Sequence, residues 1–476
     1  MSKMWRFAVA ASAFMVAGAA FCAPSGAWLV SVDPADEIGA IKPMNAVNGG
    51  PAKFKSNSRA WRHARIPFGR THDMNHSWEF GGPHTIDVDA IFPNPDADEN
   101  DPGNYDFTYT DMALDLMREC GTEPFYRLGP SIESGAKKYH THPPRDFAKW
   151  ARVCEHIILH CNEGWANGRR YGIRYWEIWF EPDLGPSAWT GTREQFLELF
   201  KTAAIHLKGR FPKLKIGGPG FANALAWKDS FLPFCRRENV PLDFYSWHAY
   251  KTDAHVVGKI ARDVRALLDT NGFERTESIL GEWNYVRTFK AGGEWEYSRQ
   301  VESGRFIQKG AAFAAAMMSE CQGAPVDVAM YYDVRTYGGM NMLFDPISCR
   351  EMKGYYPFRA WGRLLHDYGT QVRATADERV SEGASGGQLF VTSAKGKDGR
   401  LAVWLARYSN DDNVQDWRTV KIRLPKECFG RRATCHITDD VRTYTETTLD
   451  VDKDGMLELL LVPNGFALVE VAARGK

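Results

Sequence analysis

Two glutamates, Glu181 and Glu282, are the residues whose types and settings best suit catalysis. Glu181 follows Trp179 and Phe180 and precedes Pro182, at the end of the run Y-W-E-I-W-F-E-P. An apolar setting disfavours the charged form of a carboxyl group, so it suits Glu181 to the role of a proton donor. Two carboxyl groups can cleave a glycosidic bond when one donates a proton and the other attacks the anomeric carbon. We therefore predict Glu181 as the acid/base and Glu282 as the nucleophile.

Short apolar runs must position these residues, and from about residue 39 to 370 such runs alternate with amphipathic segments. This rhythm is typical of βα units, and eight of them predict a closed (β/α)₈ TIM barrel. The predicted strands are Ile38–Val47, Trp61–Phe68, Glu123–Gly129, Ile173–Glu181, Leu214–Pro219, Asp243–His248, Ser278–Trp283 and Val326–Asp333. The predicted helices include Asp111–Cys120, Phe147–Cys161, Arg193–Phe211, His255–Thr270 and Ser298–Cys321.

Four ionisable residues lie at or near the ends of these apolar strands, namely Glu181, His248, Glu282 and Asp333. Polar residues also end strands simply because loops are wet. In a TIM barrel, however, the carboxyl ends of the strands surround the active site. We therefore expect the four side chains to share one mouth.

The sequence changes character after the barrel, which we place at residues 38–372. Residues 373–476 contain alternating segments with the turn signals K-G-K-D-G and V-D-K-D-G, which predict an antiparallel β-sandwich. Residues 24–37 form an N-terminal segment in which Trp28–Asp33 is a candidate strand of that sandwich.

The first 23 residues have the features of a signal peptide: a basic start, an apolar stretch and small residues before Pro24. They predict export to the periplasm or beyond the cell. Lipid attachment at Cys22 is the second interpretation, because Phe21 fits that processing poorly. No later segment is apolar enough to predict a membrane span.

The charge balance indicates a neutral partner. Lys plus Arg and Asp plus Glu both total 59, so no long-range field favours nucleic acid or an anionic membrane. The 16 Trp and 18 Tyr fit a carbohydrate, because aromatic faces stack on the C–H faces of sugars. We expect an oligosaccharide or polysaccharide substrate.

Two candidate metal motifs fail on their details. His156 and His160 share a helix face but lack the H-E-x-x-H order. The acidic loop Asn94–Asn104 resembles a calcium loop, yet Phe107 stands where the closing Glu belongs. No P-loop or dinucleotide fingerprint occurs either, so we predict neither a metal nor a cofactor.

Several segments, in order along the chain, resemble glycoside hydrolase family 39, a clan A family of β-xylosidases, α-L-iduronidases and other exo-acting enzymes. They are Tyr105–Gly129, Trp176–Leu184, Asp243–Tyr250, Met340–Pro346 and Lys353–Leu365. The resemblance implies a barrel followed by a β-sandwich. It also implies that Glu181 is the acid/base, Glu282 the nucleophile, and that His248 and Tyr250 contact the sugar or the nucleophile.

The chain departs from the family pattern at two places. The family has Asn before the acid/base Glu, where the amide can bond the sugar 2-hydroxyl, and Phe180 stands here instead. The second strand of the family presents a His shortly after an Arg. Arg65 matches that Arg and Pro67 replaces the His, with His72 as a candidate substitute.

The missing amide can cost several kcal/mol unless another group replaces it. The substrate can differ at its 2-position, another side chain can supply the donor, or hydrolysis can be weakened or lost. Because both glutamates are present, we predict an exported retaining hydrolase, exo-acting on a pentoside in the manner of a β-xylosidase. A carbohydrate-binding pseudoenzyme is the first alternative.

A uronide-directed hydrolase is the second alternative, with Lys251 and Arg335 facing the carboxylate. The loops Thr71–His84 and Tyr139–Pro144 are expected to narrow the mouth. The predicted substrate contacts are Arg65, His72, Phe180, His248, Tyr250, Trp283, Asp333 and Arg335.

Overall fold

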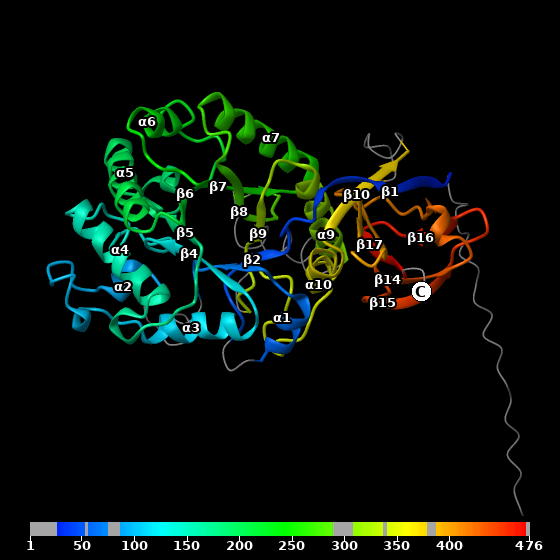
Figure 1. Ribbon diagram of the computed structural model, residues 1–476, viewed down its shortest axis with the longest axis horizontal. Coiled ribbons are helices and arrows are strands. Elements are labelled where there is room, and N and C mark those ends of the chain that lie inside the picture. The colour runs from blue at the N-terminus through cyan, green and yellow to red at the C-terminus, as the bar shows by residue number, and fades with distance from the viewer. Residues whose placement is uncertain are drawn as a thin grey trace, which may run out of the picture.

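The computed structural model describes residues 26–52, 56–74, 86–287, 289, 308–336, 340–377 and 387–472. A barrel and a β-sheet region lie side by side, and helices α9 (Gln308–Gly323) and α10 (Tyr355–Arg363) lie between them (Figure 1). The predicted signal peptide, residues 1–23, lies outside the described residues.

Eight strands close the barrel, in the order β2 to β9 around its axis. Every neighbouring pair is parallel, which confirms the predicted TIM barrel. The strands are β2 (Ala46–Asn48), β3 (Phe68–Arg70), β4 (Glu123–Leu128), β5 (Tyr175–Ile178), β6 (Lys215–Phe221), β7 (Phe244–Lys251), β8 (Glu277–Tyr285) and β9 (Val328–Tyr331).

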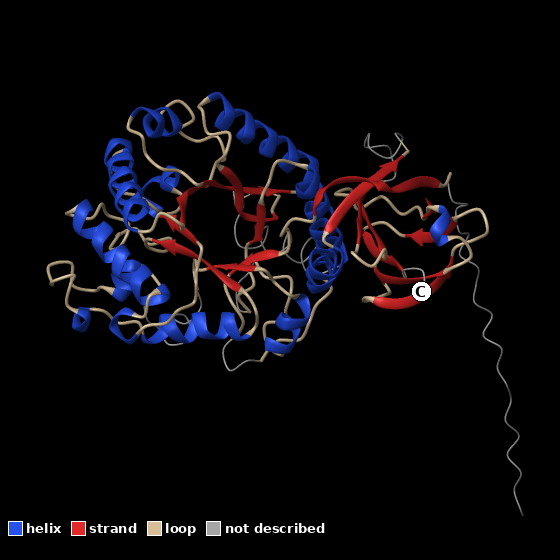
Figure 2. Ribbon diagram, viewed as in Figure 1, coloured by secondary structure: helices blue, strands red, loops and turns tan. Residues whose placement is uncertain are grey.

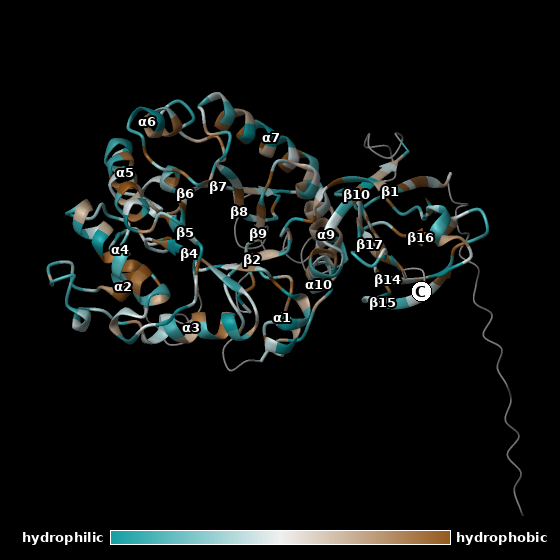
Figure 3. Ribbon diagram, viewed as in Figure 1, coloured by the Kyte–Doolittle hydropathy of each residue, from teal (hydrophilic) through white to brown (hydrophobic). Residues whose placement is uncertain are grey.

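Helices form a ring around these strands (Figure 2). They are α1 (Ser58–Ala64), α2 (Val88–Ile91), α3 (Thr108–Glu119), α4 (Phe147–Asn162), α5 (Arg193–Arg210), α6 (Phe231–Arg237) and α7 (Ala254–Thr270). Local sequence defines where they begin: Asp146 caps α4 by accepting from the Lys149 N–H, and Thr192 with Gln195 forms a capping box at α5. Brown hydrophobic segments alternate with teal polar ones along α4 and α5, as expected for helices with one buried face (Figure 3).

The prediction of a strand over Trp61–Phe68 was wrong. Residues Ser58–Ala64 form α1, and the strand begins only at Phe68. Ala60, Trp61 and Ala64 are buried, which is the spacing of one helix face rather than of a strand. The second barrel strand therefore ends at Arg70, five residues after Arg65. The predicted strand Ile38–Val47 likewise divides between the end of β1 and β2.

An apolar layer closes the bottom of the barrel. Its members come from seven strands and pack their side chains together: Ala46, Phe68, Phe125, Tyr175, Phe244, Ile279, Val328 and Met330. A polar layer that includes Asn48, Arg70, Glu177 and Ser246 is also fully buried. Because the apolar layer fills one end, the polar side chains face the other, where the strands end.

The second region is one nine-stranded sheet whose two edge strands, β15 and β16, come into contact, so that it curls around its own core. Most of its pairings are antiparallel, as predicted, but β1 (Trp28–Ala40) pairs in parallel with β13 (Arg418–Arg423). The other strands are β10 (Thr370–Ala376), β11 (Gln388–Lys395), β12 (Leu401–Tyr408), β14 (Arg432–Thr438), β15 (Thr445–Asp450), β16 (Met456–Leu461) and β17 (Gly465–Val471).

Helix α9 joins the two regions. It contacts α7 and α10 on the barrel side and β11, β12 and β17 on the sheet side. Residues 311–316, which are alanines except for Phe313, are all buried, because both sides of the helix are covered. Within the described residues, no helix is long and apolar enough to span a membrane.

Candidate active site

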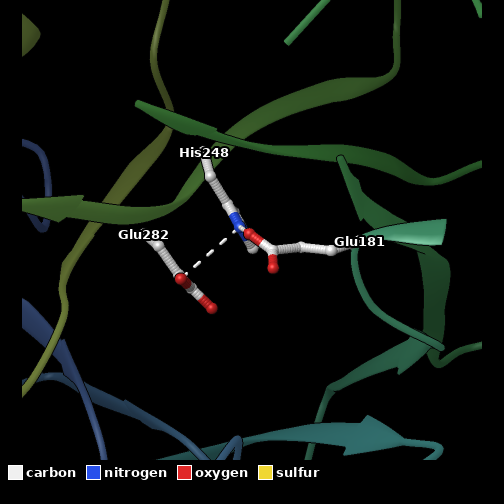
Figure 4. Close-up of side chains that lie close together, drawn as sticks. All are labelled: Glu181, His248 and Glu282. Atoms are coloured by element: carbon white, nitrogen blue, oxygen red, sulfur yellow. Dashed lines mark hydrogen bonds and ion pairs between the residues drawn. The ribbon is translucent and has the colours of Figure 1, made fainter. Parts of the chain in front are cut away.

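Glu181, His248 and Glu282 converge at the open end of the barrel. They come from the end of β5, from β7 and from β8, and Figure 4 shows their side chains pointing toward one another. One polar atom from each residue lies within 4.8 Å of those of the other two. A separation of about 5 Å between two carboxyl groups is the spacing of retaining glycosidases.

The backbone at Glu181 turns sharply out of the barrel wall. Glu181 has a φ of 39°, and its N–H donates to the Gly220 carbonyl oxygen at 2.9 Å. This turn buries the carboxyl group inside the mouth. Burial, helped by the nearby charge of Asp183, raises the pKa of Glu181 to about 8, so the group is protonated at neutral pH.

His248 holds Glu181 from one side. Its Nδ1 lies 2.6 Å from Glu181 Oε1 and 3.5 Å from Glu282 Oε2. Burial lowers the pKa of His248 to about 4, so the ring is neutral at physiological pH. The imidazole therefore fixes the orientation of Glu181 without a positive charge that would favour loss of its proton.

Glu282 has a different environment. Arg70 Nη1 donates to its Oε1 at 2.7 Å, and the Tyr250 hydroxyl donates to its Oε2 at 2.5 Å. Burial raises the pKa of Glu282, whereas the Arg70 charge and the Tyr250 hydrogen bond act in the opposite direction. One carboxyl group is thus placed as an acid and the other is supported as an anion.

Arg70 is itself held by a buried network. Its Nε donates to Glu177 Oε2 at 2.6 Å and its Nη1 donates to Asn48 Oδ1 at 2.9 Å. The Ser246 hydroxyl donates to the other oxygen of Glu177 at 2.6 Å. These partners keep the guanidinium in place below Glu282. Arg70, Glu177 and Asn48 were not predicted from the sequence; the available signal was a charged residue inside the apolar run Y-W-E-I.

Arg65 was predicted to contact the substrate, but the structure does not bring it together with the residues of this site. It follows α1, and its guanidinium makes two hydrogen bonds to the Asp367 carboxylate, at 2.7 and 2.6 Å. Because β3 ends at Arg70, the structure places Arg70 and His72, rather than Arg65, beside Glu282.

His72 and Phe180 lie together at the mouth. The ring centroids are 4.6 Å apart, and both side chains are buried. His72 Nε2 is 3.8 Å from Glu282 Oε1 and 3.7 Å from Asp73 Oδ2, too far for direct hydrogen bonds. Phe180 also lies under the Arg127 guanidinium at 5.7 Å. His72 is therefore close enough to face a sugar bound beside Glu282, and Phe180 is fully buried against the His72 ring.

Trp283 was predicted to contact the substrate, but the structure points its side chain away from the mouth. Successive residues of a strand face opposite sides, so Glu282 faces inward and Trp283 faces the helices. Its ring packs against Tyr331 at 5.2 Å and stacks on Phe358 of α10 at 6.4 Å. It is a core residue of the barrel wall.

Asp333 and Arg335 form an ion pair at the end of β9. Arg335 Nε donates to Asp333 Oδ2, and Arg335 Nη2 donates to the Tyr332 hydroxyl at 2.8 Å. That hydroxyl donates to Asp73 Oδ2 at 2.6 Å. Burial raises the pKa of Asp333 to about 6. The network lies beside His72. Asp73 and Tyr332 were not predicted from the sequence.

The two motifs that were considered for metals have structural partners. His160 Nε2 lies 2.9 Å from Asp111 Oδ1, and its Nδ1 lies 3.0 Å from the Trp165 carbonyl oxygen. His156 Nδ1 bonds the Arg152 carbonyl oxygen at 2.9 Å. In the acidic loop, Asp98 accepts from the Asn100 N–H at 3.0 Å. Both motifs thus serve the outer surface of the barrel.

Comparison with known proteins places the chain in a family. A β-xylosidase of Caldicellulosiruptor saccharolyticus is 34% identical over 169 residues, which cover 32% of this chain and 33% of that protein. A β-xylosidase of Geobacillus stearothermophilus is 32% identical over 164 residues, covering 32% of this chain and 31% of that protein. The chain thus aligns with about a third of the length of these relatives.

Solved structures share the whole fold. A glucosidase from Croceicoccus marinus superposes with a TM-score of 0.75 at 22% identity, covering 94% of this chain and 99% of that one. A monomeric β-xylosidase from Caulobacter crescentus CB15 gives a TM-score of 0.69 at 16% identity, covering 94% and 100%. The family model of Glycosyl hydrolases family 39 matches residues 83–332, more than half of the chain. The chain belongs to glycosyl hydrolase family 39.

Proposed function

We propose that the protein is a retaining, exo-acting glycosidase that hydrolyses β-xylosides or related pentosides. The observation that carries the proposal is the pair Glu181 and Glu282, which are close together and yet have different hydrogen-bond partners. Arg70 and Tyr250 donate to Glu282, whereas burial favours the protonated state of Glu181, which lies against His248. A binding protein needs neither this spacing nor this difference in partners.

The reaction proceeds in two displacements. In the first, a carboxylate oxygen of Glu282 attacks the anomeric carbon while Glu181 gives its proton to the departing glycosidic oxygen, which leaves a covalent ester on Glu282. In the second, the ionised Glu181 takes a proton from water. That water attacks the anomeric carbon and releases the sugar from Glu282.

The two partner side chains support different steps. The Tyr250 hydroxyl, which donates to Glu282 Oε2, orients the nucleophile and favours its release as an anion in the second step. The neutral His248 ring, bonded to Glu181 Oε1, keeps the acid aimed into the mouth in both steps. Both roles depend on burial, because water would weaken these hydrogen bonds.

His72 is the proposed substitute for the family's missing amide. The gap between its Nε2 and Glu282 Oε1 is 3.8 Å, and a sugar hydroxyl placed beside both atoms can bond each of them. Phe180 holds the imidazole in place through its ring. The 2-hydroxyl, which lies next to the anomeric carbon, is the group that this arrangement fits.

The choice of a neutral pentoside is supported by the names of relatives and by local charge. The two relatives named above are β-xylosidases, although a glucosidase is among the similar structures. Arg335, the cation considered for a uronate, is already bonded to Asp333 and lies 3.8 Å from Asp73 Oδ2. Its charge is compensated, which disfavours a uronide.

Export is a separate proposal, and it rests on the N-terminal sequence alone. The basic start, the apolar stretch and the small residues before Pro24 support cleavage within residues 1–23. Mass spectrometry of the mature protein, expressed with a C-terminal tag, tests it. A mature protein that retains Met1 or the basic start would contradict it.

A panel of aryl glycosides tests the proposed activity. We expect turnover of aryl β-D-xyloside above that of β-D-glucoside, α-L-arabinofuranoside and α-L-iduronide. Glu282→Ala should lower kcat by about 10³-fold or more, and a 2-fluoro xyloside should leave a covalent sugar on Glu282 that peptide mass spectrometry detects. No turnover of any substrate, with equal sugar binding in the parent, Glu181→Ala and Glu282→Ala, would reject the enzyme.

A further inference from the structure

A second hollow lies on the other side of the chain segment that carries Glu181. It is a groove of about 610 Å³ between α2, the start of α4 and the loop 139–146. Its lining includes Trp179 but none of Glu181, His248 or Glu282. Trp179 packs against Trp150 at 5.9 Å, whereas its neighbour Phe180 packs against His72. The two consecutive rings thus face the groove and the mouth, respectively.

The groove offers apolar and aromatic surface. The lining residues of this kind include Phe92, Pro143, Pro144, Trp150 and Trp179. At the rim, Tyr139 is 64% exposed, an unusual position for a tyrosine with no buried role. Its volume is within the range of ligand pockets, and flat aromatic and proline surfaces suit the C–H faces of sugars. Residues of the loop Tyr139–Pro144, which was expected to narrow the catalytic mouth, line this groove.

The polar lining is charged but compensated. His140 Nδ1 pairs with the Asp89 carboxylate, and Arg145 Nη1 lies 3.5 Å from Asp96 Oδ1. Lys149 Nζ donates to the Ala97 carbonyl oxygen at 2.6 Å. No one sign of charge prevails, which disfavours phosphate or carboxylate ligands. A neutral, hydroxyl-rich ligand can instead bond the outward atoms of these pairs.

We propose that this groove is a second carbohydrate-binding site, which holds a neutral oligosaccharide segment outside the catalytic mouth. The choice of glycan rests on the proposed function, since the groove and the mouth would bind the same class of polymer. Trp179, which lines the groove, lies two residues before the catalytic acid Glu181 in the chain. A chain held there raises the local concentration of its own ends near Glu181, so it favours polymeric over small substrates.

Affinity electrophoresis of a non-cleaving protein tests the site. Glu282→Ala protein is run through native gels that contain soluble xylan, mixed-linkage β-glucan or arabinan. We expect at least one polysaccharide to retard it. Adding Tyr139→Ala, or Tyr139→Ala with Arg145→Ala, should raise the dissociation constant for the retarding polysaccharide by about five- to tenfold. This is the effect of losing one or two stacking or hydrogen-bonding contacts.

The control keeps the groove and removes an exposed ring elsewhere. Phe429→Ala, at a residue that is 37% exposed in the sheet region, should leave retardation unchanged. Tyr139 and Arg145 are exposed, so their variants should keep the thermal unfolding midpoint of the parent. No retardation by any of the three polysaccharides, or equal retardation of parent and groove variants, would overturn the proposal.

Activity measurements separate this inference from the proposed function. In the otherwise unchanged enzyme, Tyr139→Ala should leave kcat/KM on an aryl xyloside unchanged, because that substrate fills only the mouth. If Tyr139→Ala weakens retardation but the enzyme turns over no aryl glycoside, the proposed activity is rejected and the carbohydrate site in the groove is supported. If the enzyme turns over an aryl glycoside but Tyr139→Ala does not change retardation, the site in the groove is rejected and the proposed activity is supported.

Discussion

At the scale of single residues, the chemistry depends on a proton that stays on Glu181. Its pKa is raised to about 8, mainly by burial, and among the residues that the structure describes no arginine bonds it, whereas Arg70 bonds Glu282. A general acid must be protonated before it can act. Glu181 should therefore give the pH profile of kcat/KM a basic limb, along which kcat/KM is constant well below pH 8 and falls as the pH rises through about 8. The pH profile of the parent on an aryl xyloside measures this basic limb.

Glu181→Gln tests the assignment of that limb. The variant has no proton to lose, so the decline near pH 8 should disappear on an activated aryl xyloside, whose leaving group needs little acid help.

The same substitution, Glu181→Gln, also tests how this carboxyl group affects folding stability. Because the folded pKa lies above the unfolded value of 4.5, folding stability from this group is present below pH 4.5 and is lost as the pH rises toward 8. The parent should therefore lose more thermal stability than Glu181→Gln between pH 5 and pH 8.

His72 carries a second prediction at this scale. If its Nε2 bonds the 2-hydroxyl, His72→Ala should lower kcat/KM on an aryl xyloside by about 10²- to 10³-fold, the cost of one transition-state donor. The loss should be much smaller on the 2-deoxy analogue, which lacks the hydroxyl. Phe180→Leu is the matched control, since it keeps the imidazole but removes its stacking partner. Equal losses on both substrates in His72→Ala would contradict the assignment.

At the scale of elements, three barrel strands are tied together by one buried cation. Arg70 on β3 bonds Glu177 on β5 and Glu282 on β8, and all three side chains are buried. Arg70→Met removes the cation that both buried carboxylates bond, so it should destabilise the protein by about 3–5 kcal/mol. Urea unfolding measures this. Arg70→Met combined with Glu177→Gln should recover part of the loss, and no recovery would show that the two do not act as a pair.

The elements also show what the sequence could predict. Strands β4 to β9 and helices α3, α4, α5 and α7 have regular apolar spacing, so their existence and order were predicted correctly, whereas the seven-residue helix α6 was not predicted. Glu181 and Glu282 followed from those strands, since each lies near a strand end. The strand predicted over Trp61–Phe68 was wrong because α1 is only seven residues long, and its buried Trp61 resembles a strand residue when it is considered alone.

Contacts between distant parts of the chain could not be predicted from the sequence. Glu177 is one of several charged residues near strands, and only closure of the barrel brings it to Arg70. The inward or outward direction of Trp283 depended on the register of β8, which a single residue shift reverses. The aromatic ring of Trp179 likewise gave no sign of a groove, because the α2 region and the loop 139–146 that complete it lie far away in the sequence.

At the scale of the whole molecule, the barrel and the sheet share one core through α9. The Trp404 indole on β12 donates to the Ala315 carbonyl oxygen of α9 at 3.2 Å and packs edge-on against Trp361 of α10 at 5.1 Å. Because both sides of α9 are covered, neither region can separate without exposing its apolar surface to water. We therefore expect the chain to unfold in a single transition, although it has two regions.

Trp404→Ala tests that coupling. Removing a fully buried indole should cost about 3–5 kcal/mol through lost contacts and a cavity. Because the cavity lies where the two regions meet, the whole transition should shift to lower urea, whether it is followed by far-UV circular dichroism or by aryl xyloside turnover. Leu460→Ala, at a side chain that is 37% exposed on β16, serves as the control and should shift it little. If turnover survives at urea concentrations that already remove the sheet signal, the regions are independent, and α9 belongs to the barrel alone.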